Sequence, residues 1–82
     1  MNIQITWYGH SALGIETGGY HLQVDPYIHD NPAASVTLDK LRADYILVSH
    51  GHGDHIGDTM AIAKRTGAQV ITVNEIAVWL LN

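Results

Sequence analysis

The residues from His50 to His55 are the part of the sequence best suited to chemistry, because they place three imidazoles and one carboxylate within six positions. Neutral imidazole is the commonest metal ligand among side chains, and a carboxylate beside it helps to balance the charge of a divalent ion. Four adjacent donors predict a metal site rather than a polar turn that only caps a helix, and they suggest sharing between two ions. The metal-competent residues are His50, His52, Asp54 and His55.

The backbone around these donors is expected to form a loop at the end of a strand. His50 and His52 are two residues apart, so their side chains leave a strand on the same side. Gly51 and Gly53 lack a Cβ atom, which lets the chain curl so that the last two donors also face the site. This glycine-interrupted spacing argues against a His-Asp phosphohydrolase, in which such pairs lie on helices.

The amino-terminal third is predicted to be a small antiparallel meander. Apolar and polar residues alternate from residue 3 to 7, from 12 to 17 and from 20 to 24, as they do in half-buried strands. Gly18-Gly19 tolerates positive φ at both positions, as a two-residue hairpin requires. Pro26 has no backbone N–H to donate to a neighbouring strand, so the meander is expected to end at Asp25-Pro26.

The remainder is predicted to alternate strands and helices. Residues 45–48 form a continuous apolar run, which is typical of a strand covered on both faces, and it leads directly to His50. Asp58 or Thr59 is expected to cap a helix that stops at Gly67. A βαβα order favours a parallel arrangement here, so the fold class is α/β with a mixed (α+β) sheet. The other expected elements are helices at 37–42 and 75–81 and a strand at 69–73.

Length and composition are those of one small globular domain or a piece of a larger one. The chain has 82 residues, of which 46% are hydrophobic and 15% are charged. It has no cysteine, which excludes disulfides and thiolate metal sites. The net charge of -4 and the lack of a basic cluster argue against a nucleic-acid partner. No signal-peptide pattern and no apolar run of about 20 residues is present, so we expect a cytoplasmic protein without a membrane segment.

The end of the sequence carries five large apolar side chains in six positions, which need a partner surface. The preceding chain is too short to offer that surface together with everything else. We therefore expect the natural fold to continue beyond Asn82, in the same polypeptide or in another chain, and we expect the chain alone to form oligomers. The apolar residues concerned are Ile76, Val78, Trp79, Leu80 and Leu81.

The donor spacing resembles the His-x-His-x-Asp-His motif of the metallo-β-lactamase superfamily. Gly9-His10-Ser11, Asp25-Pro26 and the run from Asp44 to His55 also look like the UPF0173 metal-dependent hydrolase group, close to its L-ascorbate-6-phosphate lactonase-like relatives. The resemblance covers essentially all of the chain but only the amino-terminal part of that family's domain. It implies that residues 1–82 are the amino-terminal half of an αβ/βα sandwich, incomplete on its own.

The resemblance also implies a ligand set and a role for each donor. His50 and His52 would hold a first metal, and Asp54 with His55 a second, with Asp54 also orienting the attacking hydroxide as the catalytic residue. The implied cofactor is a pair of divalent ions, zinc first, with manganese or iron as alternatives. The family's remaining ligands come from later in its domain, whereas a catalytic zinc normally has at least three protein ligands.

The implied function is metal-dependent hydrolysis of a small-molecule substrate. A metal-bound water, its pKa lowered to about 7, would give the hydroxide that attacks an ester, lactone, amide or phosphodiester. This chain would give half of a binuclear site, and the remaining half of the domain would be its partner. The alternative is a non-catalytic metal-binding or assembly fragment that lacks the second half of the site. The sequence does not identify one of these substrates, because one fold hosts many activities.

Two further residues are weaker candidates for the site. His10 would contact substrate or lie behind the ligands, as the resemblance suggests, or would be a turn histidine satisfied by backbone groups. Asp25 would orient a metal-binding imidazole, or would form an Asx-turn ahead of Pro26. The histidines at 21 and 29 are expected to be exposed and without a role. The residues expected in the core are Trp7, Tyr45 and Trp79.

Overall fold

A computed structural model of the chain describes residues 2–29, 31, 40–49, 53–73 and 76. Of the helix expected at 37–42, only the last three residues are described, and they are not α-helical. The helix expected from Glu75 and Trp79 within it lie outside the described residues, apart from Ile76, which is helical. The described elements are β1 (Ile3–Gly9), β2 (Ala12–Thr17), β3 (Tyr20–Val24), β4 (Tyr45–Val48), α1 (Gly53–Ile56), α2 (Thr59–Thr66) and β5 (Gln69–Thr72).

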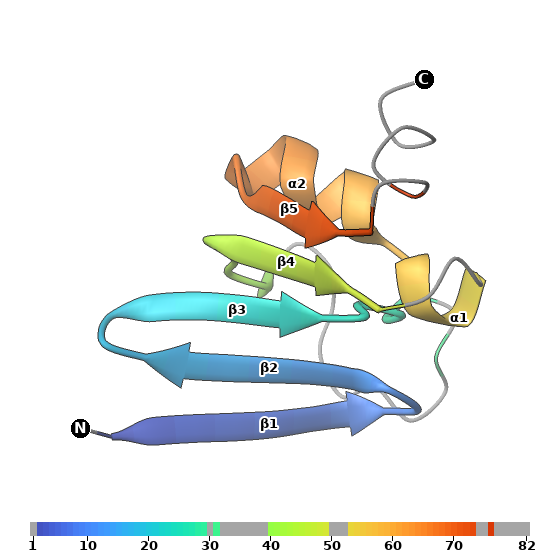
Figure 1. Cartoon of the computed structure of the whole chain (residues 1–82). Helices are drawn as coiled ribbons and strands as arrows, with labels where there is room; N and C mark the ends of the chain where they lie inside the picture. The colour runs from blue at the N-terminus through green and yellow to red at the C-terminus, as the bar shows by residue number, and fades with distance from the viewer. Residues whose placement is uncertain (1, 30, 32–39, 50–52, 74–75, 77–82) are drawn as a thin grey trace.

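The five described strands form one mixed sheet in chain order (Figure 1). β1, β2 and β3 are antiparallel neighbours, and β3, β4 and β5 are parallel neighbours. Gly18 and Gly19 turn the hairpin with φ of 57° and 82°, values that glycine adopts without a steric cost. Parallel strands need a crossover connection, and α2 provides the one between β4 and β5. The predicted meander, the parallel unit and the mixed fold class are confirmed.

The hydrophobic core lies on the face of the sheet that α2 covers. Ile62 of α2 is 1% exposed, and Ile46 of β4 is fully buried in the same cluster. The helix stops where the sequence predicts, because Gly67 takes a left-handed φ of 74° and its N–H donates to the Ala63 carbonyl at 2.8 Å. No helix within the described residues is long and apolar enough to cross a bilayer. The buried apolar cluster consists of Ala12, Ile28, Leu41, Ala43, Ile46, Val48, Ile62 and Ile76.

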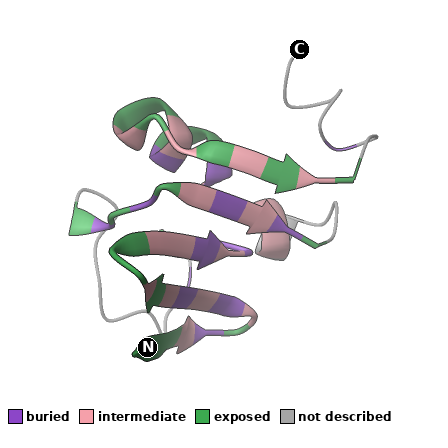
Figure 2. Ribbon diagram, turned by 60° about the vertical axis from the view of Figure 1, so that its left-hand side comes forward, coloured by how far each residue is buried: buried purple, intermediate pink, exposed green. Residues whose placement is uncertain are grey.

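The opposite face of the sheet is apolar and is covered by nothing in the described parts of the chain (Figure 2). The cross-strand register places Trp7 opposite Leu13, and Ile5 opposite Ile15, on this face. Trp7 is 66% exposed, so its expected place in the core is wrong, whereas Tyr45 is half-buried. We call this surface the open face; its residues are Ile3, Ile5, Trp7, Leu13, Ile15, Thr17, Tyr20, Leu22, Val24, Tyr45, Leu47, Gln69 and Ile71.

Candidate metal site

The candidate site lies where the carboxyl ends of two parallel strands meet (Figure 1). Asp25 follows β3, Ser49 follows β4, and α1 begins at Gly53. His50 and His52 are outside the described residues, and nothing of the Asp54 side chain is described. Their predicted roles as ligands therefore stay predictions. The one predicted ligand whose side chain is described is His55.

Asp54 and His55 lie in the short helix α1, which corrects the expectation that this stretch avoids helix. Gly53 is the first residue of this helix, whereas the sequence predicts that it curls a loop. Glycine is unfavourable mainly in a helix interior, and at a helix end its cost is small. The glycine spacing was therefore a weak argument against a single helical turn.

Asp25 is a buried carboxylate that accepts hydrogen bonds on both oxygens. It is 4% exposed, and the Ser49 backbone N–H donates to its Oδ1 at 2.7 Å. The Ser49 hydroxyl donates to its Oδ2 at 2.5 Å, and His55 Nδ1 lies 3.0 Å from the same oxygen. Burial raises the pKa of Asp25, but the hydrogen bonds from Ser49 and His55 outweigh it, so the net pKa is lowered. Asp25 is thus held in its charged form.

The contact with Asp25 determines how the His55 ring is oriented. Its side chain is only 16% exposed, and Nδ1 faces the Asp25 carboxylate. A neutral imidazole that donates from Nδ1 carries its lone pair on Nε2, the form in which histidine binds a metal. The donor chemistry of His55 and Asp25 therefore fits a divalent metal ligand with a carboxylate behind it.

His10 lies beside His55, with ring centroids 5.6 Å apart. Its ring is also in T-shaped contact with the Tyr27 ring, with ring centroids 5.9 Å apart. Within the described residues, His10 and Asp25 are the two non-glycine residues with positive φ, at 55° and 45°. Such backbone conformations cost about 1–3 kcal/mol each, persist only where surrounding contacts hold them, and cluster at functional sites. Both weaker candidates from the sequence are thus brought to the same end of the sheet as His55.

Asn31 holds the turn that carries His10, and sequence reasoning missed it. It is 7% exposed, and its amide nitrogen lies 3.0 Å from the Gly9 carbonyl and 2.9 Å from the Tyr27 carbonyl. The Trp7 indole N–H donates to the His10 carbonyl at 2.9 Å. In the sequence Asn31 stands in a turn-like stretch between Asp30 and Pro32, and nothing there distinguishes it from an ordinary turn residue.

Comparison with known proteins identifies the family of this chain. A model of the beta-lactamase superfamily domain matches residues 4–78. The chain belongs to the β-lactamase superfamily. UPF0173 metal-dependent hydrolases from Shouchella clausii and Carboxydothermus hydrogenoformans are 47% and 51% identical to it, over 95% of this chain and 34% of theirs. The resemblance to the UPF0173 group is confirmed.

The fold of this β-lactamase superfamily chain also matches a solved structure. A metallo hydrolase from Ignicoccus hospitalis superposes with a TM-score of 0.87 at 36% identity, covering 96% of this chain and 35% of the other. The chain thus spans about a third of the length of the relatives that it matches. Membership of this family leaves the His-Asp phosphohydrolase alternative without support.

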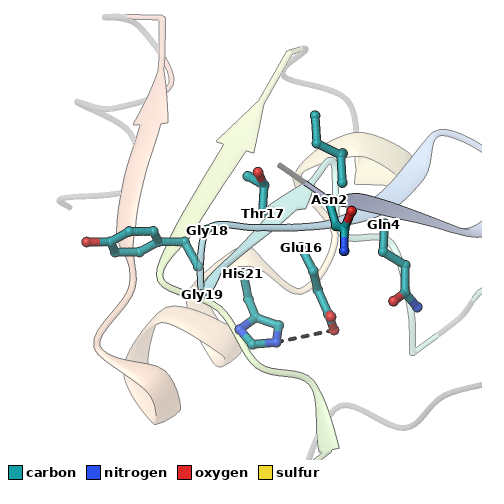
Figure 3. Close-up of a pocket in the computed structure, with 9 residues that line it drawn as sticks. Asn2, Gln4, Glu16, Thr17, Gly18, Gly19 and His21 are labelled. Atoms are coloured by element: carbon teal, nitrogen blue, oxygen red, sulfur yellow. Dashed lines mark ion pairs between the residues drawn. The ribbon is translucent and has the colours of Figure 1, made fainter.

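A second histidine of this β-lactamase superfamily chain contacts carboxylates at the far end of β3 (Figure 3). His21 Nε2 lies 3.2 Å from Glu16 Oε1, and its Nδ1 lies 3.8 Å from Asp44 Oδ2. Its side chain is 24% exposed, so the expectation of an exposed residue is wrong for His21, whereas His29 is exposed as expected. His21 and Glu16 line an open surface hollow of about 660 Å³, away from His55.

The described residues alone do not assemble a complete metal-binding group. Within residues 2–29, 31, 40–49, 53–73 and 76, no three histidine, aspartate or glutamate side chains are placed to hold a metal ion. This finding covers His55 and Asp25, but it does not cover His50, His52 or the Asp54 side chain.

Proposed function

We propose that this chain supplies part of the active site of a metal-dependent hydrolase. The observation that carries the proposal is the contact between His55 Nδ1 and the buried carboxylate of Asp25, the residue that follows β3. The chain belongs to the β-lactamase superfamily, and its relatives are named metal-dependent hydrolases. Both facts support metal-dependent hydrolysis. A carboxylate behind an imidazole is the usual second partner of a metal-binding histidine.

In this proposal four residues bind two divalent ions, with zinc as the first choice. His50 and His52 hold one ion, and Asp54 and His55 hold the other. A bound divalent metal lowers the pKa of water to about 7, which makes hydroxide available near neutral pH. Asp54 orients the attacking oxygen, and Asp25 keeps the His55 ring in one tautomer and one orientation. The substrates are small molecules with an ester, lactone, amide or phosphodiester bond.

The open face supports the proposal that the rest of the domain packs against this chain. None of its thirteen residues is charged. Two sheets that pack face to face stack about 10 Å apart through such apolar side chains. A second sheet on this face would complete a sandwich and would bring further ligands to the metals. The relatives have the length for it, since this chain covers 34% of theirs.

A second candidate is a metal-binding or assembly fragment without catalysis of its own. It is favoured by the ligand count, because four donors give two protein ligands to each of two ions. Hydrolysis of a panel of lactones, esters and phosphodiesters separates the candidates. We expect turnover only when the chain is joined by the remainder of the domain. Turnover by the 82-residue chain alone would contradict the proposed sharing of the site.

The metal site itself is tested by calorimetric titration of the purified chain, alone and in the completed domain, with zinc and with manganese. His55→Ala should weaken binding by more than about a hundredfold, because it removes a ligand and not only a group behind one. His21→Ala is the matched control, and it should leave affinity unchanged. Equal effects of the two substitutions, or no binding by the unaltered protein in either form, would overturn the proposed site.

The proposal that the open face packs against the rest of the domain is tested by placing a charge on it. Trp7→Lys should lower the free energy of unfolding by about 1 kcal/mol, since it removes the hydrogen bond from the indole to the His10 carbonyl. It should abolish association with the remainder of the domain, or self-association of the chain alone, measured by analytical ultracentrifugation. Gln4→Lys adds the same charge to the other face of β1, and it should leave association intact. Unchanged association of the Trp7→Lys variant would show that this face docks nothing.

A further inference from the structure

We propose that Asp58 is a positioning residue that locks the segment 25–29 onto the segment 55–58 and so fixes the ring contacts that His10 makes with His55 and with Tyr27. The inference deepens the proposed function, since it takes His55 as a metal ligand. Asp58 itself touches neither a metal ligand nor a reacting group in the contacts described. It acts through the two segments that it joins.

Four hydrogen bonds tie the two segments together along their length. The Asp58 carboxylate Oδ2 accepts the backbone N–H of Ile28 at 2.8 Å and that of His29 at 2.8 Å. The Asp58 backbone N–H donates to the Pro26 carbonyl at 2.9 Å. At the other end, His55 Nδ1 lies 3.0 Å from Asp25 Oδ2. Both ends of the segment that carries His55 are therefore attached to the segment that carries Tyr27.

Gly57 provides independent support for this attachment. A Cβ atom at Gly57 would lie 2.6 Å from the Pro26 carbonyl oxygen and 2.6 Å from Tyr27 Cα. Gly57 also has a φ of 49°, a backbone conformation that residues with a side chain rarely adopt. The two backbones thus approach as closely as glycine permits. Any side chain at position 57 would push the segment with Tyr27 away from the segment with His55.

The alternative role of Asp58 is to cap helix α2. Asp58 stands at the N-cap position, where aspartate usually accepts a hydrogen bond from the helix that it begins. Its side chain makes no such bond. Only its backbone carbonyl joins the helix, by accepting the Ile62 N–H at 2.9 Å. The carboxylate is instead committed to two amides thirty and twenty-nine residues away along the chain. Charge-assisted bonds of this kind are about twice as strong as neutral ones.

The consequence of the lock is a defined approach to His55. Tyr27 is half-buried within the locked segment, and its ring is in T-shaped contact with His10, which in turn lies beside His55. A substrate at the proposed metal would therefore lie near the His10 ring, with Tyr27 behind it. Release of the segment would move Tyr27 and would loosen the Asp25 carboxylate at the segment's start. Asp58 thus fixes the position of the proposed ligand His55 and of the rings of His10 and Tyr27 near it.

The test compares Asp58→Ser with Asp44→Ser in the full chain. Serine is as good a helix N-cap as aspartate, but its shorter side chain cannot span to the amides of Ile28 and His29. We expect amide hydrogen exchange at those two positions to speed up about tenfold to a hundredfold, as loss of hydrogen bonds to a charged group implies. The His55 ring nitrogens should also shift toward the NMR values of a ring that exchanges between tautomers.

Asp44→Ser is the matched control because the Asp44 carboxylate accepts the His21 N–H at 2.8 Å at the far end of the sheet. It should alter exchange at His21 and leave Ile28, His29 and the His55 ring unchanged. Asp58→Asn is the second variant, used if Asp58→Ser unfolds. It keeps one acceptor oxygen, so it should fold and should speed up exchange at Ile28 and His29 to a smaller extent.

Unchanged exchange at Ile28 and His29 in both Asp58 variants would overturn the proposal. So would faster exchange confined to the first turn of α2, because that result assigns Asp58 to helix capping. Metal titration keeps the two proposals apart. If His55→Ala leaves metal affinity intact, the proposed metal site fails, while the exchange result for Asp58 still stands or falls by itself.

Discussion

Two histidines contact carboxylates at opposite ends of β3, and their surroundings give the two contacts different consequences. His55 and Asp25 are 3.0 Å apart, with side chains 16% and 5% exposed. His21 and Glu16 are 3.2 Å apart, with side chains 24% and 56% exposed. Water screens the second contact and replaces it readily when it breaks. At the buried end water replaces a lost contact far less readily, so the cost of breaking it is larger.

The number of donors on each carboxylate enlarges the difference. Asp25 takes the Ser49 N–H, the Ser49 hydroxyl and His55 Nδ1 on its two oxygens. Glu16 extends from an exposed position at the edge of an open hollow (Figure 3). A histidine beside a carboxylate therefore has one fixed ring orientation at the site, whereas at the hairpin the contact is exposed and weak. Burial and shared donors, rather than distance, separate the two ends.

The largest effect is expected from Asp25→Ala, which removes the carboxylate that accepts from Ser49 and contacts His55. It should lower the free energy of unfolding by about 3 kcal/mol, as the loss of one partner of a buried pair does. Urea denaturation followed by circular dichroism measures this value. Glu16→Ala is the control at the other end. A loss below about 1 kcal/mol for Asp25→Ala would mean that the two ends are equivalent.

The next effect is expected from Gly57→Ala at the site end, compared with Gly18→Ala at the hairpin end. Both glycines have positive φ, but a Cβ at Gly57 would meet backbone at 2.6 Å, whereas nothing lies within 4 Å of one at Gly18. We expect a loss of about 2 kcal/mol at Gly57 and about 1 kcal/mol at Gly18. Thermal unfolding of both variants measures the pair. Equal losses would show that strain in φ alone decides, and that close packing at the site adds nothing.

The smallest effect is expected from Glu16→Gln. It keeps the shape of the side chain and removes its charge beside His21. Exposed ion pairs contribute about 0–1 kcal/mol, so we expect a change below about 0.5 kcal/mol in the free energy of unfolding. The difference should shrink further when denaturation is repeated at 1 M salt, because exposed charges are then screened. A salt-independent loss above 1 kcal/mol would erase the contrast between the ends.

Most of the sheet could be predicted from the sequence because its elements depend on local rules. The alternation in β1, β2 and β3, the Gly18-Gly19 turn and the Gly67 helix stop each depend on neighbouring residues only. Trp7 shows where such rules stop. Its alternation marks one face of a strand correctly, but whether that face is buried depends on a layer that the described residues do not contain.

The candidate site could be predicted in part for a similar reason. The donor spacing and the Asp25-Pro26 strand end were visible in the sequence, and the structure brings Asp25 and His10 beside His55. Asn31 and the long-range use of Asp58 were not visible. Capping rules assign Asp58 to the helix that follows it, whereas its carboxylate bonds a segment thirty residues earlier. Only the tertiary arrangement decides between two good partners for one carboxylate.

The order of contacts along the chain has a consequence for folding. The hairpins of β1, β2 and β3 join sequence neighbours, but the bonds that build the site join residues 24 to 30 positions apart. Closing such loops costs chain entropy before their contacts repay it, so distant pairings form slowly. We expect the site end to be absent from the folding transition state. Substitutions at Asp25 and Asp58 should then accelerate unfolding and leave the refolding rate nearly unchanged.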